Sequence, residues 1–450
     1  MKIKRSLIQI FLLCSFLLQA VSSGAQPVTK IAAGSWHSLF LKSDGSLWVM
    51  GYNPFGELGD GSFIMTNRPE QIVASNVTAI AAGEYHSLFL KSDGSLWAMG
   101  ANFSGQLGDG ANGIINLPER IVSSNVTAIA AGGEHSLFLK SDGSLWGMGA
   151  NFFGQLGDGT FNATNMPEQI VSSNVVAISA GDTHSLFLKN DGSLWGMGNN
   201  DVGQLGDGTY GSAGNNFGIN RPKQIVSNNV KAIAGGGGHT LFLKSDGSLW
   251  AMGWNYYGQL GDGTINYAGI VTPKEIVTNG VIAIAAGYYH SLFLKSDGSL
   301  WAMGYNGSGE LGDGTLNDTN RPERILPSSI TTIAAGFEHG LLLKSDGSLW
   351  AMGANESGQL GDGTTNSVAR AEQILAAYNQ ISGQPLNGTN MQLSFVGIAN
   401  ANYALDRSLS LSPPNWIPQI TNQASSYGPL ILTNAPVVTT NNFWRIRLVP

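Results

Sequence analysis

Cysteine and basic residues are scarce in this sequence of 450 residues. Its single cysteine, Cys14, lies in an apolar N-terminal stretch, so stability must come from packing and not from an intrachain disulfide. The 30 Asp and Glu residues outnumber the 23 Lys and Arg residues, and the basic residues form no patch in the sequence. Such a chain is poorly suited to binding nucleic acid or anionic membranes. We therefore expect neither as a partner.

Motifs for catalysis and for ion or phosphate binding are also missing. The sequence holds no Gly-x-Ser-x-Gly elbow, no cysteine nucleophile outside the N-terminal stretch, and no His-x-x-x-His or Glu-x-x-His spacing. Its glycine-rich segments lack the Lys-Ser/Thr ending of a phosphate loop. We therefore expect no metal, no cofactor and no enzymatic activity.

The N-terminus has the pattern of an export signal. Lys2, Lys4 and Arg5 precede an apolar run from Leu7 to about Val21, and the small residues 23–25 offer a cleavage site. This pattern predicts a secretory signal peptide over residues 1–25 and a protein that is secreted, periplasmic or in the cell envelope. No later apolar stretch approaches the ~18 residues of a membrane-spanning helix. We expect no membrane contact after cleavage.

One segment recurs seven times along the chain. Its pattern is A-G-x-x-H-S-L-F-L-K-S-D-G-S-L-W-x-M-G-x-N-x-x-G-[QE]-L-G-D-G, with small changes. The repeat histidines lie 49, 49, 49, 55, 51 and 49 residues apart, and they account for every histidine in the chain: His37, His86, His135, His184, His239, His290 and His339. A fixed period near 50 residues indicates a propeller, a solenoid or another repeat array.

Each repeat contains four short strand-like runs. In the second copy they cover 70–73, 77–81, 87–90 and 95–99, each bounded by Gly, Asp, Asn or Pro. The Asp93-Gly94 pair between two of them is typical of a tight hairpin. Because a four-stranded sheet cannot bury both faces alone, consecutive sheets must stack. The sequence predicts an all-β chain with a seven-bladed β-propeller of four-stranded antiparallel blades over residues 27–376.

The two ends of the repeat region suggest how the ring closes. The chain enters with a lone first strand at 28–32 and leaves with a lone fourth strand at 371–375. We expect strands from the two ends to pair and remove the free edge. Beyond the propeller, polar residues 377–391 are expected to form a linker, and residues 392–450 a small β-sandwich-like module.

Strand alternation also predicts which loops share a face. In a four-stranded meander, the loop between strands one and two lies on the same side as the loop between strands three and four. Both loops vary among the copies, whereas the Ser-Asp-Gly hairpins on the other side hardly change. All the variation is therefore expected on one face.

The repeat resembles that of the regulator of chromosome condensation family. The matching residues are the A-A-G-x-x-H-[ST], D-G-x-L-W-x-x-G and N-x-x-G-Q-L-G-D-G segments, which extend over about 350 residues. The resemblance implies a seven-bladed propeller. Family members include a nuclear exchange factor for the GTPase Ran, a plant ultraviolet photoreceptor and a secreted bacterial inhibitor that caps β-lactamases. The predicted leader and acidic charge make the secreted bacterial type the closer analogy, although fold alone does not settle function.

The invariant polar and aromatic residues are interpreted as structural. The seven histidines lie one per blade, too far apart to share a metal, and we expect them to hydrogen-bond a neighbouring loop. The repeated Asp-Gly pairs lack the alternating oxygen ligands of a calcium loop and are typical of turns. The third-strand tryptophans are expected between blades, in the core: Trp48, Trp97, Trp146, Trp195, Trp250, Trp301 and Trp350.

The residues that differ among the copies are the functional candidates. Many are aromatic, with Glu and Asp between them, which is the composition of a protein-binding surface. The predicted partner-binding residues are Trp36, Tyr52, Phe55, Tyr85, Phe103, Phe152, Phe153, Trp254, Tyr256, Tyr257, Tyr288, Tyr289, Tyr305 and Phe337.

This composition leads to the hypothesis of a secreted, monomeric, non-enzymatic propeller that binds a protein on its aromatic loop face. The alternatives are a glycan-binding protein or an extracellular enzyme that uses the same face. Nucleotide exchange is a weaker alternative, based on the family resemblance. Capping of blade cores by some of these aromatic residues is the structural alternative.

Overall fold

The computed structural model describes residues 26–211 and 218–375, together with six strands between 382 and 449. The expected signal peptide, residues 1–25, lies outside the described residues. The described secondary structure is entirely β, as the sequence predicts, and it separates into two units. No described helix is long and apolar enough to cross a membrane.

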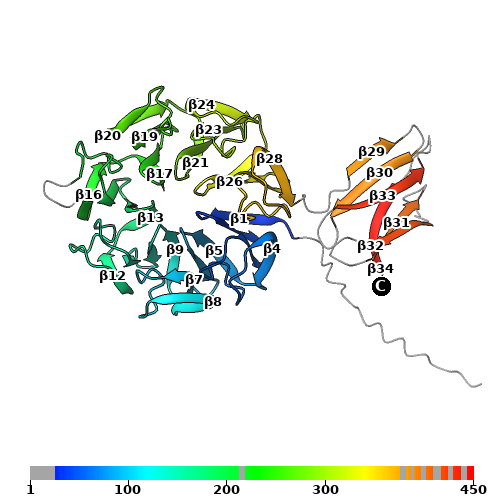
Figure 1. The fold of residues 1–450 in the computed structure, drawn as a ribbon, viewed down its shortest axis with the longest axis horizontal. Coiled ribbons are helices and arrows are strands. Elements are labelled where there is room, and N and C mark those ends of the chain that lie inside the picture. Colours follow the sequence, from blue (N-terminus) through cyan, green and yellow to red (C-terminus); the bar gives the residue numbers. More distant parts are fainter. Residues whose placement is uncertain are drawn as a thin grey trace, which may run out of the picture. The chain divides into compact units, whose positions relative to one another are not determined.

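Strands β1–β28 form seven sheets around a common axis (Figure 1). Within each sheet the strands pair in chain order as an antiparallel meander. The blades are β1 (Val28–Ala33), β2 (His37–Lys42), β3 (Leu47–Gly51), β4 (Thr66–Val73); β5 (Val77–Ala82), β6 (His86–Lys91), β7 (Leu96–Asn102), β8 (Gly113–Val122); β9 (Val126–Ala131), β10 (His135–Lys140), β11 (Leu145–Gly149), β12 (Thr164–Val171); β13 (Val175–Ala180), β14 (His184–Lys189), β15 (Leu194–Asn199), β16 (Gly218–Val226); β17 (Val230–Gly235), β18 (His239–Lys244), β19 (Leu249–Asn255), β20 (Asn266–Val277); β21 (Val281–Ala286), β22 (His290–Lys295), β23 (Leu300–Gly304), β24 (Thr319–Leu326); and β25 (Ile330–Ala335), β26 (His339–Lys344), β27 (Leu349–Gly353), β28 (Val368–Leu375).

The second strand of each blade is almost completely buried. In β6, five of the six residues from His86 to Lys91 are buried, because both faces of the strand pack against neighbouring blades. The apolar side chains gather in seven clusters, one at each blade-to-blade interface. Burial of this apolar surface is the main force that holds the blades together.

The repeat tryptophans lie at the edge of these interface clusters and are half-buried. Trp97 stacks on Phe89, with ring centroids 5.9 Å apart, and the Lys91 ammonium lies 4.0 Å from the centroid of the Trp97 ring. Its indole nitrogen donates to the Ser95 hydroxyl over 2.8 Å. The expected inter-blade position is confirmed. One face of each indole ring packs on the interface cluster, and a lysine side chain covers the other face.

The ring closes differently from the sequence-based expectation. Strand β1 pairs with β2, and β28 pairs with β27, so no blade combines strands from the two ends of the chain. The seventh blade instead packs on the first as any other pair does, and a cluster that includes Phe40 and Leu341 fills their interface. The prediction of closure by strand pairing was wrong. Strand 28–33 belongs to the first blade and strand 368–375 to the last, and each of these blades is formed from one continuous stretch of the chain.

Histidine and hydroxyl side chains connect the second strands of neighbouring blades. His86 Nε2 lies 2.9 Å from Ser136 Oγ, and His184 Nε2 lies 3.0 Å from Thr240 Oγ1. The His339–Ser38 pair, at 2.9 Å, extends this pattern across the closure of the ring. Six of the seven histidines make such a bond. The expected structural role is confirmed for these six, but the partner is a strand hydroxyl of the neighbouring blade and not the expected loop.

The C-terminal unit contains two three-stranded antiparallel sheets. One has the order β29-β30-β33 and the other β32-β31-β34. Their bounds are β29 (Ser382–Leu386), β30 (Asn390–Val396), β31 (Asn402–Ser408), β32 (Ile417–Gln423), β33 (Pro429–Pro436) and β34 (Phe443–Val449). Strand β29 falls inside the range 377–391 expected to be a linker, so this unit starts earlier than the composition suggested.

Candidate functional site: the irregular face of the propeller

The variable loops lie together on one face, as strand alternation predicts. The Tyr52 amide donates to the Trp36 carbonyl over 2.9 Å, and the Ala101 amide to the Tyr85 carbonyl over 2.8 Å. These bonds connect the loop between strands one and two with the start of the loop between strands three and four. We call this side the irregular face.

A repeated asparagine fixes the long loop of each blade. Asn255 Nδ2 donates to Asp262 Oδ1 over 3.0 Å, and the Leu260 amide donates to Asn255 Oδ1 over 3.1 Å. Equivalent pairs occur in all seven blades. The second Asp of the repeat therefore shapes a turn, which agrees with its structural interpretation. It also holds the neighbouring variable residues in place.

Thirteen aromatic side chains form a band across this face, which we call the aromatic arc. Nine rings are connected by ring contacts with centroids 4.2–6.4 Å apart: Tyr267, Tyr256, Tyr257, Trp254, Tyr305, Tyr289, Tyr288, Phe337 and Trp36. Four more form a second group: Tyr52, Phe55, Tyr85 and Phe103. A hydrogen bond between the side chains of Trp36 and Tyr85 joins the two groups.

The structure brings together twelve of the fourteen predicted aromatic residues and adds Tyr267. None of the fourteen is buried, and Phe103, Phe152 and Tyr256 are exposed. Within residues 26–211 and 218–375, Phe152 and Phe153 make no ring contact with the arc. Tyr267 lies in the lengthened segment of the fifth repeat, at the start of β20, and is 73% exposed. Its position inside an insertion was the signal that sequence reasoning missed.

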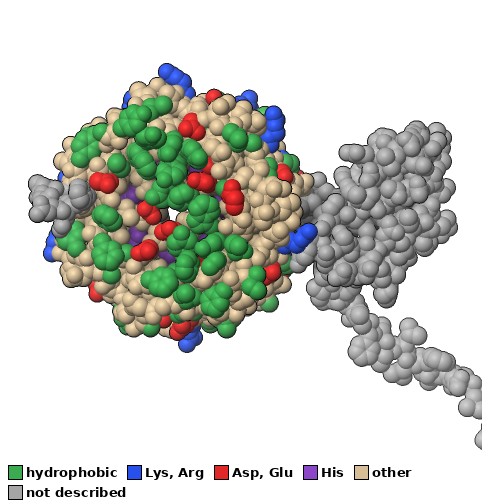
Figure 2. Space-filling view, viewed as in Figure 1, with side chains coloured by type: hydrophobic (Ala, Val, Ile, Leu, Met, Phe, Trp, Pro, Cys, Tyr) green, Lys and Arg blue, Asp and Glu red, His purple; other side chains and the backbone are tan. Residues whose placement is uncertain are grey.

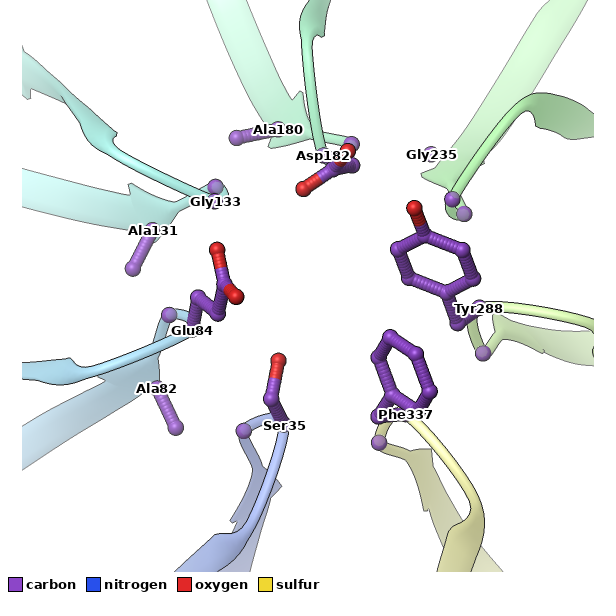
Figure 3. A pocket seen from close by; sticks show the side chains of 18 of the residues that line it. Ser35, Ala82, Glu84, Ala131, Gly133, Ala180, Asp182, Gly235, Tyr288 and Phe337 are labelled. Carbon is purple, nitrogen blue, oxygen red and sulfur yellow. The ribbon is translucent and has the colours of Figure 1, made fainter. Parts of the chain in front are cut away.

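The arc surrounds part of a cavity on the propeller axis. The cavity has a volume of about 160 Å³ and is lined by the residues that precede the repeat histidines. In Figure 3, the side chains of Glu84, Asp182, Tyr288 and Phe337 extend into the opening. The sequence-based prediction of partner-binding residues includes Tyr288 and Phe337. It omits Glu84 and Asp182, because only aromatic residues were chosen among the variable positions.

Negative charge is concentrated around this opening. In Figure 2, Asp and Glu side chains surround the opening on the axis, whereas Lys and Arg side chains appear only at the outer edge of the propeller. Burial, together with the charges of Glu84 and Glu134, raises the pKa of Asp182 to about 7, and a hydrogen bond from Tyr288 opposes the rise. Burial also raises the pKa of Glu84.

The described residues contain no group of three or more His, Cys, Asp or Glu side chains that could hold a metal ion. The histidine rings are buried between the blades, and burial lowers the pKa of each to about 3 or 4. They remain neutral hydrogen-bonding groups near pH 7. What the irregular face offers is therefore aromatic contact surface beside carboxylates.

Comparison with known families agrees with the repeat geometry. The model of the RCC1-like domain matches residues 16–266 and 121–394, which together cover most of the chain. The chain belongs to the RCC1-like domain family. The family contains both protein-binding propellers and exchange factors.

Two curated relatives of this RCC1-like chain match over about one hundred residues. The ultraviolet-B receptor UVR8 of Arabidopsis thaliana is 33% identical over 105 residues, 22% of this chain and 24% of the receptor. A protein RCC2 homolog of Xenopus laevis is 35% identical over 107 residues, 23% of this chain and 21% of the relative. The matches span about a quarter of the relatives' length, so the activities of the whole proteins are not transferred.

Solved structures show the same fold over most of the propeller. Human WBSCR16 has a TM-score of 0.65 and 24% identity, with 76% of this chain and 95% of that chain covered. Yeast RCC1 (Prp20) bound to Kap60 has a TM-score of 0.66 and 23% identity, with 78% and 85% covered. Another structure of Prp20p from Saccharomyces cerevisiae, described with its binding to Gsp1p and histones, has a TM-score of 0.62 and 24% identity, with 71% and 84% covered. At these identities the likeness concerns the fold alone.

Proposed function

We propose that this RCC1-like chain is an exported, non-enzymatic propeller that binds a protein partner through the aromatic arc. The observation that supports this most directly is the extent of the arc: nine rings are in contact, four more form an adjoining group joined to them at Trp36 and Tyr85, and none of the twelve predicted members is buried. Large, rigid aromatic side chains give contact area at low entropic cost and are enriched among the residues that dominate binding energy.

The carboxylates between the rings favour a partner with basic side chains. Glu84, Glu134 and Asp182 lie at the axis end of the arc, and Glu338 lies beside Tyr289 and Tyr305. Complementary charge increases the association rate and discriminates among partners. A solved propeller of the same fold also binds proteins: yeast Prp20p is described with its binding to Gsp1p and histones, and in a complex with Kap60.

The test removes three rings from the middle of the arc. The Tyr256→Ala, Tyr257→Ala and Tyr289→Ala changes are combined and compared with Ser92→Ala, Ser141→Ala and Ser245→Ala on the opposite hairpins. Capture of a protein from the culture medium and envelope extract of the source organism is measured together with Tm. We expect the tyrosine variant to lose capture while Tm falls by only a few degrees. A large fall in Tm, or capture equal to that of the serine variant, would contradict the proposal.

A further inference from the structure

The cavity on the axis is lined by three residues from each blade. The first two are Ala or Gly in every blade, so they contribute no polar or charged side chain to the cavity. The third residue differs among blades, and two of the seven are glycine. The polar, charged and aromatic side chains of the cavity are therefore Ser35, Glu84, Asp182, Tyr288 and Phe337.

These side chains divide the opening into a charged side and an aromatic side. Figure 3 shows the carboxylates of Glu84 and Asp182 extending inward from one part of the ring, and the rings of Tyr288 and Phe337 from another. The centroids of those two rings are 4.2 Å apart.

The two glycines leave the space that this arrangement needs. A Cβ atom at Gly133 would clash with Asp182 Oδ1, and one at Gly237 would lie 2.8 Å from the Tyr288 ring. The larger side chain of the following blade extends over each glycine. The shape of the cavity therefore depends on a glycine in one blade and a larger side chain in the next.

The negative charge in the cavity has no cationic partner among the lining residues. None of them is Lys, Arg or His. The Tyr288 hydroxyl hydrogen-bonds the Asp182 carboxylate but brings no positive charge. Carboxylates that are partly removed from water without a counter-charge are costly, and a bound cation removes that cost.

We propose that the axial cavity binds an organic cation, an alkylammonium or alkylguanidinium group. The charged head lies between Glu84 and Asp182, and the hydrocarbon stem packs against Tyr288 and Phe337. Aromatic rings and carboxylates both attract such a head, and the stem gains by leaving water. The volume of about 160 Å³ is several times the roughly 30 Å³ that a water molecule occupies in the liquid, so a short alkyl chain fits.

This chemistry has two possible sources. One is a Lys or Arg side chain of a protein lying on the aromatic arc, which reaches the cavity at Tyr288 and Phe337. That source rests on the proposed function. The other is a free small amine, which would bind whether or not the arc binds a protein.

The test measures binding of n-butylammonium, butylguanidinium and neutral 1-butanol to the full chain by ligand-observed NMR at pH 8. We expect dissociation constants of about a millimolar for the two cations and at least about tenfold weaker binding of butanol. Asp182→Asn and Glu84→Gln should each weaken binding of the cations about fivefold. Glu356→Gln, which changes an exposed carboxylate that does not line the cavity, should not. Equal binding of butanol, or equal losses in all three variants, would overturn the proposal.

Proton linkage gives an independent readout. The groups facing the cavity head region are Glu84, Glu134, Asp182 and the Tyr288 hydroxyl. Since the pKa of Asp182 is raised to about 7, cation affinity should increase between pH 6 and pH 8 as its proton is released. Affinity that stays constant over this range, or that falls, would count against the assigned site.

Two further measurements separate the sources and the two proposals. A Gly-Gly-Lys-Gly-Gly peptide that binds more tightly than n-butylammonium, with no binding of its norleucine analogue, would identify a partner side chain. Weaker binding of the lysine peptide would identify a free amine. A Tyr256→Ala and Tyr257→Ala double variant keeps Tyr289 in contact with Tyr288 and Phe337. It should retain n-butylammonium binding while it loses protein capture, so failure of protein capture and failure of the cation site give different results.

Discussion

At the residue scale, one histidine lacks the hydroxyl partner that the other six have. The position facing His290 is Gly340, whereas the equivalent position is Ser or Thr in every other blade. Both ring nitrogens of His290 are buried without a hydrogen-bond partner. An unpartnered buried polar group reduces stability.

We predict that Gly340→Ser increases the free energy of unfolding by about 1 kcal/mol, because it supplies the missing partner. The added Cβ would lie 3.0 Å from the flexible end of Met352, and the same Met position pairs with serine in the first blade. Urea unfolding measures the change. The matched control is Ser136→Gly, which removes a partner from His86 and should lower stability. A Gly340→Ser variant less stable than the parent would contradict this account of the histidine ring.

At the element scale, each long loop depends on its buried asparagine. Asn255 is fully buried, and its amide nitrogen also donates to the Thr264 carbonyl over 3.1 Å. The loop it fixes carries Tyr256 and Tyr257. The geometry of the aromatic arc therefore depends on a side chain that lies outside the arc.

We predict that Asn255→Ala lowers the free energy of unfolding by about 2–3 kcal/mol, since it leaves several buried groups without partners. Hydrogen exchange of the loop amides between 256 and 264 should become faster. The control is Asn162→Ala, which changes an exposed asparagine in the third blade. Equal effects of the two substitutions on stability and exchange would show that the buried asparagine does not fix the loop.

The elements also show what the sequence reveals and what it does not. Periodicity predicts the blades, the faces and the histidine role, because these depend on residues present in every copy. It cannot show that β1 belongs to the first blade, since a repeating pattern looks the same wherever the unit is cut. It also cannot separate Tyr288, which enters the cavity, from Tyr289, because their directions depend on loop geometry. The start of β29 was missed because Gly383 and Pro385 are typical of a linker.

At the scale of the whole molecule, seven equivalent histidines act together on pH dependence. Burial lowers their pKa values from 6.5 to about 3 or 4, so between these values the unfolded chain binds more protons than the folded chain. Their contribution to stability is complete above pH 6.5 and is lost as the pH falls. Burial raises the pKa values of Glu57 to about 7, Glu310 to about 8 and Asp182 to about 7, which has the opposite effect, but the histidines outnumber them.

We therefore predict a steep loss of stability between about pH 6 and pH 4. Urea unfolding at several pH values measures it. Replacing one histidine, as in His86→Gln, should reduce the slope against pH by roughly one proton equivalent, about 1.4 kcal/mol per pH unit. Stability that is constant from pH 7 to pH 4.5 would mean that the histidines are not held neutral.

The propeller has one face of variable loops, the irregular face, and one face of nearly constant hairpins. The central claim is that the partner binds the irregular face. The most direct measurement is photo-crosslinking from the full chain, with p-benzoylphenylalanine placed at Tyr257 in the arc or at Ser296 in an opposite hairpin. We predict a discrete protein adduct from position 257 in the native culture medium and none from position 296. Adducts of equal yield from both positions, or an adduct from position 296 alone, would contradict the central claim.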